Sequence, residues 1–580
     1  MRIRNCCVVC VIVLVLLLVF FVHFQITNSD ASFSFPKPTQ SEHHFHVVGE
    51  ESLKSGKTLY VGGSGPNNYT KIQDAIDNAS TGDTVFIYDD SSPYCESLSV
   101  DWPSISIVGE NRKTTIIKSP YKNLAILSIV GDEVSVCNLT FLGGDYGIMD
   151  EYGNSLFISN CSIDTYHGIT LNSKDNTVIN SNISNIYVSS SYGTFSSNNS
   201  FISCTMGYTE IRSSGNKIIN SNISELVLSW ASDCSIYNNS IKDGLYIRGE
   251  EESYWVHNIK NNTVNEKPLL YYLDKSSFSL ADLDVGELIL ANCSNIYILN
   301  VSAQAGILAG YSDNIDFSKP GSPSVYLSHS SNCTIDCRNI SESSLYYSED
   351  NVMSGFGNGS RLSLYQSNNN RVYDSKFKKI YMEGGKGNKF LRCNFENHVD
   401  YHGVAIELHS TSYNDFSYCN VSNSYYGVWL AAPHNIFHNC NFLNNTFTFT
   451  IMGSSNKIIG NTIAYSHKGI CVLWSKNNTI QKNLILGNDK GVELDVYYNG
   501  GQNKINYNNF VKNEIHAEVY FIEKAMAYNN WNRNYWDNWP KYIPKPIISR
   551  EAMFGSYFLS LLNIDWLPLP APYQTSSQLT

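Results

Sequence analysis

Short apolar runs, separated by single polar residues or glycines, repeat along most of this chain. Runs such as Lys457-Ile458-Ile459 and Val472-Leu473-Trp474 are rich in the β-branched and aromatic residues that favour strands. A Gly followed by Ile or Val opens many of these runs, at Gly147, Gly168, Gly306, Gly403, Gly427, Gly469 and Gly491. The steps between neighbours include 21, 24, 42 and 22 residues, so 42 spans two periods. The chain therefore has a structural repeat of about 21–22 residues.

Two further stations keep step with the glycine station. One is an Asn placed two residues before Ile, Val or Phe, at Asn176, Asn216, Asn388, Asn414, Asn456, Asn478 and Asn503. The other lies two residues before an apolar residue, at Cys137, Cys161, Ser181, Cys204, Ser221, Asn239, Ser375, Cys393, Cys419, Cys440, Asn461, Asn483 and Asn508. A unit of this length with no 3.6-residue periodicity has no room for a helix, which excludes leucine-rich, ankyrin and tetratricopeptide arrays. The pattern predicts an all-β solenoid, a parallel β-helix with three short strands in each coil.

The chemistry of the stations fits the sharp bends of such a coil. Asn tolerates the left-handed conformation, and its amide can pair with the Asn of the next coil. With coils stacked at about 4.8 Å, residues 58–540 would make roughly 22 coils. The irregular stretch from Glu266 to Asp284, which contains Lys267-Pro268-Leu269, is expected to leave the solenoid as a lateral loop.

The N-terminal segment predicts export. Arg2 and Arg4 precede nineteen residues, Cys6 to Phe24, in which His23 is the one strongly polar member. Residues 1–31 are therefore either a cleaved signal peptide or a signal-anchor, and both place the rest of the chain outside the cell. Residues 32–57 are a predicted linker, 58–120 an N-terminal cap with the first coils, 121–540 the repeats, and 541–580 a C-terminal cap or tail.

Composition narrows the function. The net charge of −12 and the isoelectric point near 5.6 argue against a nucleic-acid partner, which would need a basic face. Charged residues are only 16% of the 580, whereas Asn alone accounts for 66 and Tyr for 39, so the surface should be built of amides and hydroxyls. Asn-x-Ser/Thr sequons, at Asn68, Asn138, Asn160 and other positions, are potential glycan acceptors in an exported chain. The repeated cysteines predict an inner column of free thiols, although neighbouring coils would also bring them within disulfide reach.

The two ends of the exported part resemble a known family. The N-terminal resemblance lies in Tyr69-Thr70-Lys71-Ile72-Gln73-Asp74-Ala75-Ile76 and in Ile105-Ser106-Ile107-Val108-Gly109, and the C-terminal one in Asn534-Tyr535-Trp536-Asp537. These segments resemble the NosD-like group of pectin-lyase-like proteins. The resemblance implies a single-stranded right-handed parallel β-helix with a short capping helix, on which Ile72, Ala75, Ile76 and Ala79 form an apolar stripe, and a Trp-rich C-terminal cap. It says little about activity, because this fold carries many functions.

Enzymes of the pectin-lyase-like superfamily cut or epimerise acidic polysaccharides, but neither their lyase nor their hydrolase residue set is intact here. The weak catalytic candidates are His167 with Asp164, and His402 with Asp400, in two Tyr-His-Gly stations. Copper is the group's other association. His398, His402, His409, His434, His438 and His467 lie close in sequence, but their different stations predict different directions, and no metal site or cofactor is expected.

Pairs of neighbouring tyrosines are candidates for binding sugars without catalysis. Tyr425, Tyr426, Tyr497 and Tyr498 could stack on sugar rings, since a Tyr ring joins a flat apolar face to a polar tip. The sequence favours a non-catalytic, exported cell-surface solenoid with a structural, adhesive or carbohydrate-binding role. Its expected partners are polysaccharides or cell-surface glycans, and a membrane if residues 1–31 stay attached. The alternative is a diverged polysaccharide lyase or glycoside hydrolase.

Overall fold

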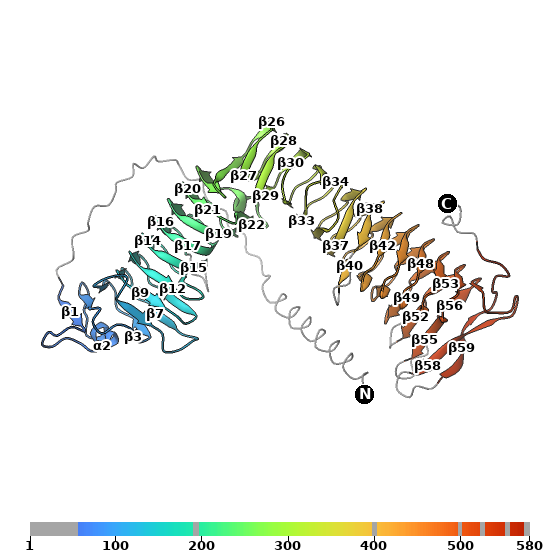
Figure 1. Ribbon diagram of the computed structural model, residues 1–580, viewed down its shortest axis with the longest axis horizontal. Helices are drawn as coiled ribbons and strands as arrows, with labels where there is room; N and C mark the ends of the chain where they lie inside the picture. The colour runs from blue at the N-terminus through green and yellow to red at the C-terminus, as the bar shows by residue number, and fades with distance from the viewer. Residues whose placement is uncertain are drawn as a thin grey trace, which may run out of the picture. The chain divides into compact units, whose positions relative to one another are not determined.

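The computed structural model describes residues 56–189, 196–396, 403–496, 501–521, 528–551 and 557–573. Its described residues are nearly all strand, in sheets of 10, 13 and 36 strands, and nearly all neighbouring strands are parallel (Figure 1). The predicted signal or anchor segment lies outside the described residues. Within them, no helix combines the length and the apolar character needed to cross a bilayer.

A regular coil contains three short strands, as the sequence predicts. One coil runs through β43 (Tyr426–Ala431), β44 (Ile436–His438) and β45 (Asn441–Leu443). The next runs through β46 (Phe447–Ile451), β47 (Lys457–Ile459) and β48 (Thr462–Ala464), and each strand pairs in parallel with its counterpart one coil before. Alternate side chains point inward, so Val428, Leu430, Phe437 and Phe442 are fully buried. The interior of these coils is therefore a continuous stack of apolar rungs.

Two consecutive residues with different conformations and roles form each bend. The first adopts the left-handed conformation, as His434 does with φ 60° and Asn477 with φ 59°. The next residue is the buried ladder residue: Asn435 Oδ1 accepts the Asn414 backbone N–H at 3.1 Å, and Asn456 Oδ1 accepts that of Asn435 at 2.8 Å. The predicted pairing of Asn with the next coil is confirmed. The left-handed conformation, however, belongs to the preceding residue rather than to these ladder asparagines, because the ladder amide must face inward while the chain turns.

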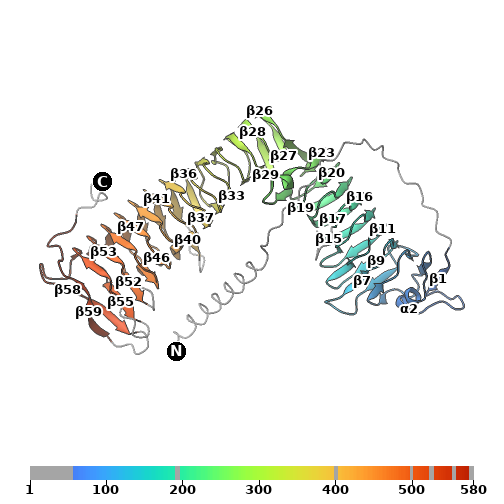
Figure 2. The same cartoon turned by 180° about the vertical axis from the view of Figure 1, so that it is seen from behind.

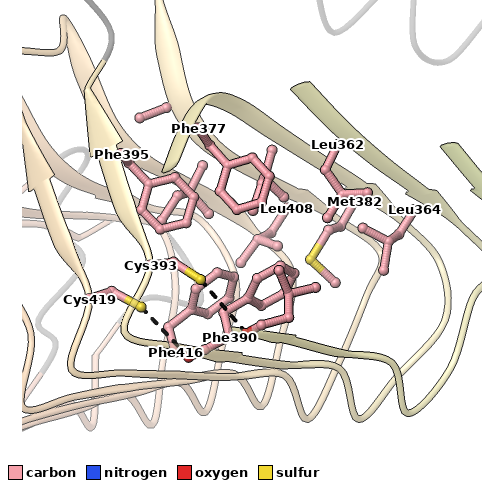
Figure 3. Close-up of a cluster of buried hydrophobic side chains, with 14 of the residues drawn as sticks. Leu362, Leu364, Phe377, Met382, Phe390, Cys393, Phe395, Leu408, Phe416 and Cys419 are labelled. Atoms are coloured by element: carbon pink, nitrogen blue, oxygen red, sulfur yellow. Dashed lines mark hydrogen bonds between the residues drawn. The ribbon is translucent and has the colours of Figure 1, made fainter. Parts of the chain in front are cut away.

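Most cysteines of the repeat lie inside the solenoid, but Cys137 is half-buried and is in register with Ser159, not with Cys161. All twelve described cysteines carry free thiols, and Cys393, Cys419 and Cys440 are buried on successive coils. Figure 3 shows Cys393 and Cys419 beside the buried rings of Phe377, Phe390, Phe395 and Phe416. Their packing is that of small apolar residues.

The solenoid interior consists of two hydrophobic cores, which meet in a seam. The first core runs from Val61 to Val264 and the second from Leu280 to Ile547. At the seam, β24 (Thr263–Val264) pairs antiparallel with β25 (Lys267–Leu273), so the chain reverses. Next come β26 (Ser276–Ala281) and β27 (Asp284–Ala291), which start the second stack (Figures 1 and 2).

The predicted lateral loop at 266–284 is therefore wrong. These residues are strands of the first coil after the reversal, and the Pro268 that marked them as irregular lies in β25, whose antiparallel partner is only two residues long. In β27, Leu288 and Leu290 face the second core, whereas Ile289 and Ala291 on the opposite face pack into the first. The outer face of the second stack thus closes the open end of the first.

Both ends of the solenoid are covered, as the fold prediction required. The short helix α2 (Ile72–Asp77) buries Ile72, Ala75 and Ile76, and the Glu96 carboxylate accepts its first backbone N–H groups. At the other end, β58 (Lys545–Glu551) and β59 (Tyr557–Asp565) form an antiparallel pair beyond the buried Trp536. Because these elements cover the ends of the stacked coils, the coil edges are shielded from other chains.

Candidate functional site

The outer face of the 36-stranded sheet carries most of the solenoid's reactive side chains. In the second stack this face runs over β33 (Glu342–Tyr346), β35 (Ser360–Tyr365), β37 (Lys376–Glu383), β40 (Val404–His409), β43, β46, β49 (Lys468–Leu473), β52 (Lys490–Val496) and β55 (Ile515–Phe521). Parallel register places the outward residues of successive coils directly above one another. Tyr346 pairs with Tyr365, Tyr381 with Glu407, and Glu407 with Trp429. Each such column is a continuous surface feature.

A pocket of about 490 Å³ opens on this face, over β33, β35, β37 and the start of β40. Its polar and aromatic lining comes from Glu342, Arg361, Ser363, Tyr365, Lys378, Lys379 and Tyr381. Arg361 and Lys379 are register partners on adjacent coils, so two cations meet in the pocket wall. The rings of Tyr365 and Tyr381 lie 5.5 Å apart. The pocket therefore offers positive charge beside flat apolar faces.

Lys379 of the pocket wall is paired with the neighbouring Glu407. Glu407 contacts Lys379 Nζ at 2.5 Å and His409 Nε2 at 2.9 Å. Burial acts to raise the pKa of Glu407, but these two partners outweigh it and hold the pKa below its usual range. The Tyr381 hydroxyl donates to Glu383 at 2.7 Å, and burial with this carboxylate raises the Tyr381 pKa. At neutral pH Glu407 is thus a charge-balanced carboxylate, and Tyr381 holds its proton.

An aromatic patch follows directly on β43 and β46. It consists of Tyr425, Tyr426, Trp429 and Phe447. Tyr426 stacks on Phe447 at 5.2 Å and meets Trp429 edge-on at 5.1 Å, and Tyr425 meets Tyr426 edge-on at 4.9 Å. All four side chains are half-buried, so part of each ring remains open to solvent. The predicted stacking residues Tyr425 and Tyr426 therefore lie at the centre of an aromatic surface.

Beyond the patch, two lysines and two glutamates form a network across β49, β52 and β55. Glu493 contacts Lys468 at 2.5 Å and Lys490 at 2.7 Å, and Lys490 also contacts Glu518. Burial acts to raise the pKa of Glu493, but the two lysines outweigh it, so its pKa is lowered. Asp495, whose buried Oδ1 has no hydrogen-bond partner among the described residues, has its pKa raised to about 6 by burial and by Glu493. The network closes the far side of the aromatic patch with balanced charges.

The first catalytic candidate pair, His167 and Asp164, is not joined by a hydrogen bond in the described structure. The His167 ring stacks on Tyr146 at 4.5 Å and touches Tyr166 and Tyr187 edge-on. Asp164 ends β12 (Ser162–Asp164) with an exposed side chain. Among the described residues, no hydrogen bond joins the His167 side chain to a carboxylate. His167 therefore belongs to an aromatic cluster on the first stack.

The other candidates divide between described and undescribed positions. Asp400, His402, Tyr497 and Tyr498 lie outside the described residues, and their roles stay predictions. Of the histidines considered for copper, His409 contacts Glu407, His438 contacts Asp415, His467 contacts Asp489, and His434 stacks on Tyr413. Three metal-ligating side chains do not converge anywhere in the described part of the chain.

Sequence reasoning missed Arg361, Lys379 and Tyr381. A signal existed: Arg361 and Lys379 are 18 residues apart, a coil length that also separates Asn370 from Asn388. Aligning the coils on their ladder asparagines would have placed the two cations side by side. The family motifs did not identify these three residues, because none of the motifs contains them.

The chain has only a weak likeness to the solved structures named here. No curated protein matches the chain. Among solved structures, the PL6 family alginate lyase AlyGC is 10% identical, with 89% of this chain and 99% of that one covered and a TM-score of 0.20. The Azotobacter vinelandii mannuronan C-5 epimerase AlgE6 A-module is 12% identical, with 87% and 95% covered and a TM-score of 0.14. Tailspike protein 3 of bacteriophage CBA120 is 9% identical, with 87% and 68% covered and a TM-score of 0.16. Likeness at these scores carries no argument about activity.

A family model described as a right-handed β-helix region matches residues 290–456 and 403–538. The matched residues lie in the second stack, whose coils bear the pocket and the aromatic patch. Together with the parallel coils and their in-register ladders, this match shows that the fold is a right-handed parallel β-helix.

Proposed function

We propose that the protein is a polysaccharide-binding surface solenoid that holds a glycan chain on the outer face from β33 to β46. The observation that carries this proposal is the continuity of the pocket with the aromatic patch. Tyr365, Tyr381 and His409 succeed one another at 5.5 and 5.6 Å, and Glu407 leads in register to Trp429. A glycan chain bound in the pocket would therefore extend directly onto the exposed parts of the aromatic rings.

The chemistry of the face selects the ligand. Tyr and Trp rings present apolar faces to sugar rings while their polar tips remain hydrated. Lys379 is paired with Glu407, so Arg361 supplies the positive charge of the pocket wall, and a guanidinium pairs with a carboxylate through two parallel hydrogen bonds. The proposed ligand is therefore a polysaccharide that carries carboxylate groups.

Binding without turnover is favoured by the state of the ionisable groups. A general base must be free to accept a proton near the operating pH. Glu407 is already held by a lysine and a histidine, and Tyr381 keeps its proton. The chain would thus act as a structural or adhesive element that grips a glycan.

The second candidate function is a polysaccharide lyase. It is favoured by one observation, the contact of His409 with Glu407 beside Tyr381 and Lys379. A lyase needs a base, a proton donor and a cation that neutralises the sugar carboxylate, and these residue types are all present. The release of unsaturated products from a panel of uronate polysaccharides, followed by ultraviolet absorbance, would support this function; no release would support binding alone.

Glycan binding can be measured with polygalacturonate by isothermal titration calorimetry. Trp429→Ala removes an indole from the patch, and we expect the affinity to fall about tenfold, since stacking on one aromatic ring contributes on the order of 1–3 kcal/mol in nucleic-acid complexes. The matched control is Tyr465→Ala, because Tyr465 is an exposed ring, 62% accessible, outside the patch. Equal losses in both variants, or no binding by the unaltered protein to any polysaccharide tested, would overturn the proposal.

We further propose that the solenoid is exported and stands at the cell surface. The support is the basic start and long apolar run of residues 1–31. N-terminal sequencing of the mature protein tests this. A start near Ser32 would mean a cleaved signal, and an intact Met1 in a membrane fraction would mean an anchor. An intact N-terminus in the cytosol would contradict export.

A further inference from the structure

The positive charge of this acidic protein is concentrated in one short stretch. Residues 361–392 contain eight basic residues and two acidic ones, although the whole chain has a net charge of −12. The basic residues are Arg361, Arg371, Lys376, Lys378, Lys379, Lys386, Lys389 and Arg392. They fall on two consecutive coils, so the stretch forms a basic belt.

Register sets like charges directly against one another in this belt. Arg361 lies beside Lys379 on the pocket face, and Arg371 of β36 (Arg371–Tyr373) lies beside Lys389 of β38 (Lys389–Leu391) on the 13-stranded sheet. Like charges opposite one another on neighbouring strands destabilise a sheet. Each of these pairs therefore lowers the stability of the sheet unless an anion between or beside the two cations neutralises it.

The two like-charge pairs differ in whether a neighbouring carboxylate forms an ion pair with one of the cations. On the pocket face, Glu407 neutralises Lys379. On the 13-stranded sheet, Arg371 and Lys389 are both exposed, and no ion pair joins either to any described carboxylate. Asp415 follows Lys389 in register, but it contacts His438 at 2.9 Å. No described carboxylate therefore forms an ion pair with Arg371 or Lys389, although Asp415 lies beside Lys389 in register.

Lys386 enlarges this site on the same coil as Lys389. Its backbone N–H donates to Asn368 Oδ1 at 3.0 Å, and Asn368 and Arg371 share the previous coil. The side chain of Lys386 is exposed. Three cations from two adjacent coils are thus presented at one edge of the 13-stranded sheet, whereas the pocket opens on the 36-stranded sheet.

We propose that Arg371, Lys386 and Lys389 form a second binding surface, which takes a polyanion carrying phosphate or sulfate ester groups. Coils rise by about 4.8 Å, a separation that one tetrahedral oxyanion can bridge with two of its oxygens. The Arg371 guanidinium suits such a group because its fork of N–H donors matches two oxygens, and a lysine serves as a mobile point charge. This surface stands independently of the proposed glycan face, because it lies on another sheet.

The matched control lies in the same column of outward residues. Lys457 has Ile436 and Thr479 as register neighbours, and Lys504 has Thr479 and Asn530. These two lysines have the exposure of the belt residues without a like-charged neighbour. A double substitution at Lys457 and Lys504 therefore removes the same net charge from the same sheet without touching the belt.

The test uses the full-length protein with heparin and with inorganic polyphosphate, measured by fluorescence titration at several salt concentrations. We expect Arg371→Gln with Lys389→Gln to weaken binding at least tenfold and to reduce the slope of log affinity against log salt by about 1.4, the value for two lost contacts with a single-stranded polyanion. We expect Lys457→Gln with Lys504→Gln to change the affinity less than twofold. The belt variant should also unfold at a higher temperature, because it removes a repulsion.

Three results would overturn the proposal: equal losses in the belt and control variants, no binding of heparin or polyphosphate by the unaltered protein, or tighter binding of duplex DNA of equal charge. Preference for heparin would identify sulfate as the group, and preference for polyphosphate would identify phosphate. Polygalacturonate separates the two sites. Its binding should survive the belt substitutions and fall with Trp429→Ala, so failure of one site leaves the other measurable.

Discussion

At the scale of single residues, the polar side chains inside the bends hold the coils together. A buried backbone N–H that loses its acceptor costs about 1–3 kcal/mol. The ladder asparagines meet this need with one oxygen: Asn435 Oδ1 accepts both the backbone N–H and the side-chain amide of Asn414, and its own amide donates to Thr411 and Pro433 carbonyls. One amide thus serves its own coil and the coil before it.

Replacing Asn435 by Ala should therefore destabilise the solenoid by roughly 1–3 kcal/mol, because the Asn414 N–H is left without an acceptor. Urea unfolding followed by circular dichroism measures the loss. Asn441→Ala is the control, since Asn441 is exposed and its amide pairs with Asn420 at the surface, where changes usually stay within about 0.5 kcal/mol. Equal effects at both positions would show that burial of the ladder is not what matters.

A buried carboxyl at the seam makes stability depend on pH. Glu287 Oε2 accepts the Leu245 backbone N–H at 2.9 Å, and burial raises the pKa of Glu287 to about 8. Folding then favours the protonated form. The contribution of Glu287 to stability is greatest at low pH, falls between the unfolded pKa near 4.5 and the folded pKa near 8, and levels off above it, with a slope of at most about 1.4 kcal/mol per pH unit.

Glu287→Gln should remove this fall, so the variant should be more stable than the unaltered protein at pH 8 and similar to it at pH 5. Thermal unfolding midpoints across that range provide the measurement. Glu514→Gln, at an exposed glutamate, should keep the original pH profile. A pH profile unchanged by Glu287→Gln would mean that this carboxyl is charged in the folded protein.

At the scale of elements, the seam depends on a close approach of backbone to an indole. Trp255, at the end of η1 (Glu252–Trp255), is fully buried, and a Cβ placed on Gly310 of β29 (Ser302–Gly310) would lie 2.1 Å from its ring. Tyr271 adds polar contacts, because its hydroxyl donates to the Trp255 carbonyl and accepts the His257 N–H. The small size of Gly310 lets the two stacks pack without a gap.

Gly310→Ala should cost about 1–3 kcal/mol, the usual range for overpacking. Increased cleavage near η1 in limited proteolysis would locate the damage at the seam. Gly357→Ala serves as the control, because the nearest atom to its added Cβ, a carbonyl oxygen, lies at 3.8 Å. If Gly310→Ala left both stability and cleavage unchanged, Trp255 would not be fixed against β29.

At the scale of the whole molecule, we expect the coils to unfold in local groups rather than in one cooperative step. Each coil contacts mainly its neighbours, and such arrays unfold as a series of local units. The two cores strengthen this expectation, because they share only the seam. A lesion in one core should therefore leave the distant coils of the other intact.

Phe437→Ala tests this, since Phe437 is fully buried and stacks on Phe416 at 4.6 Å. Removing the ring should cost about 3–5 kcal/mol locally. Hydrogen exchange followed by mass spectrometry should show faster exchange on coils next to Phe437 and unchanged exchange around Val136 in the first core. Leu443→Ala, at a side chain that is 39% exposed, is the control. A uniform rise across both cores would contradict local unfolding.

The repeat carried most of the fold prediction. Stations such as Asn414 and Asn456 recur because each coil needs the same bend, so the ladder, the inward apolar positions and the parallel strands were all readable. The candidate sites were harder to predict from the sequence. Coil length varies from 17 residues between Asn199 and Asn216 to 26 between Asn388 and Asn414, and each change shifts which outer residues become neighbours. Glu407 and His409 were visible as residues, but the contact of Glu407 with Lys379 was not.

The sequence by itself determined the coil: its length, its β character and the side chains that stack inside it, because these follow from local periodicity and recur many times. Only the tertiary structure decided where the chain reverses at β24 and β25, how the outer face of β27 closes the first core, and which cations meet on adjacent coils. These features occur once and join residues through register. A pattern that depends on repetition therefore does not contain them.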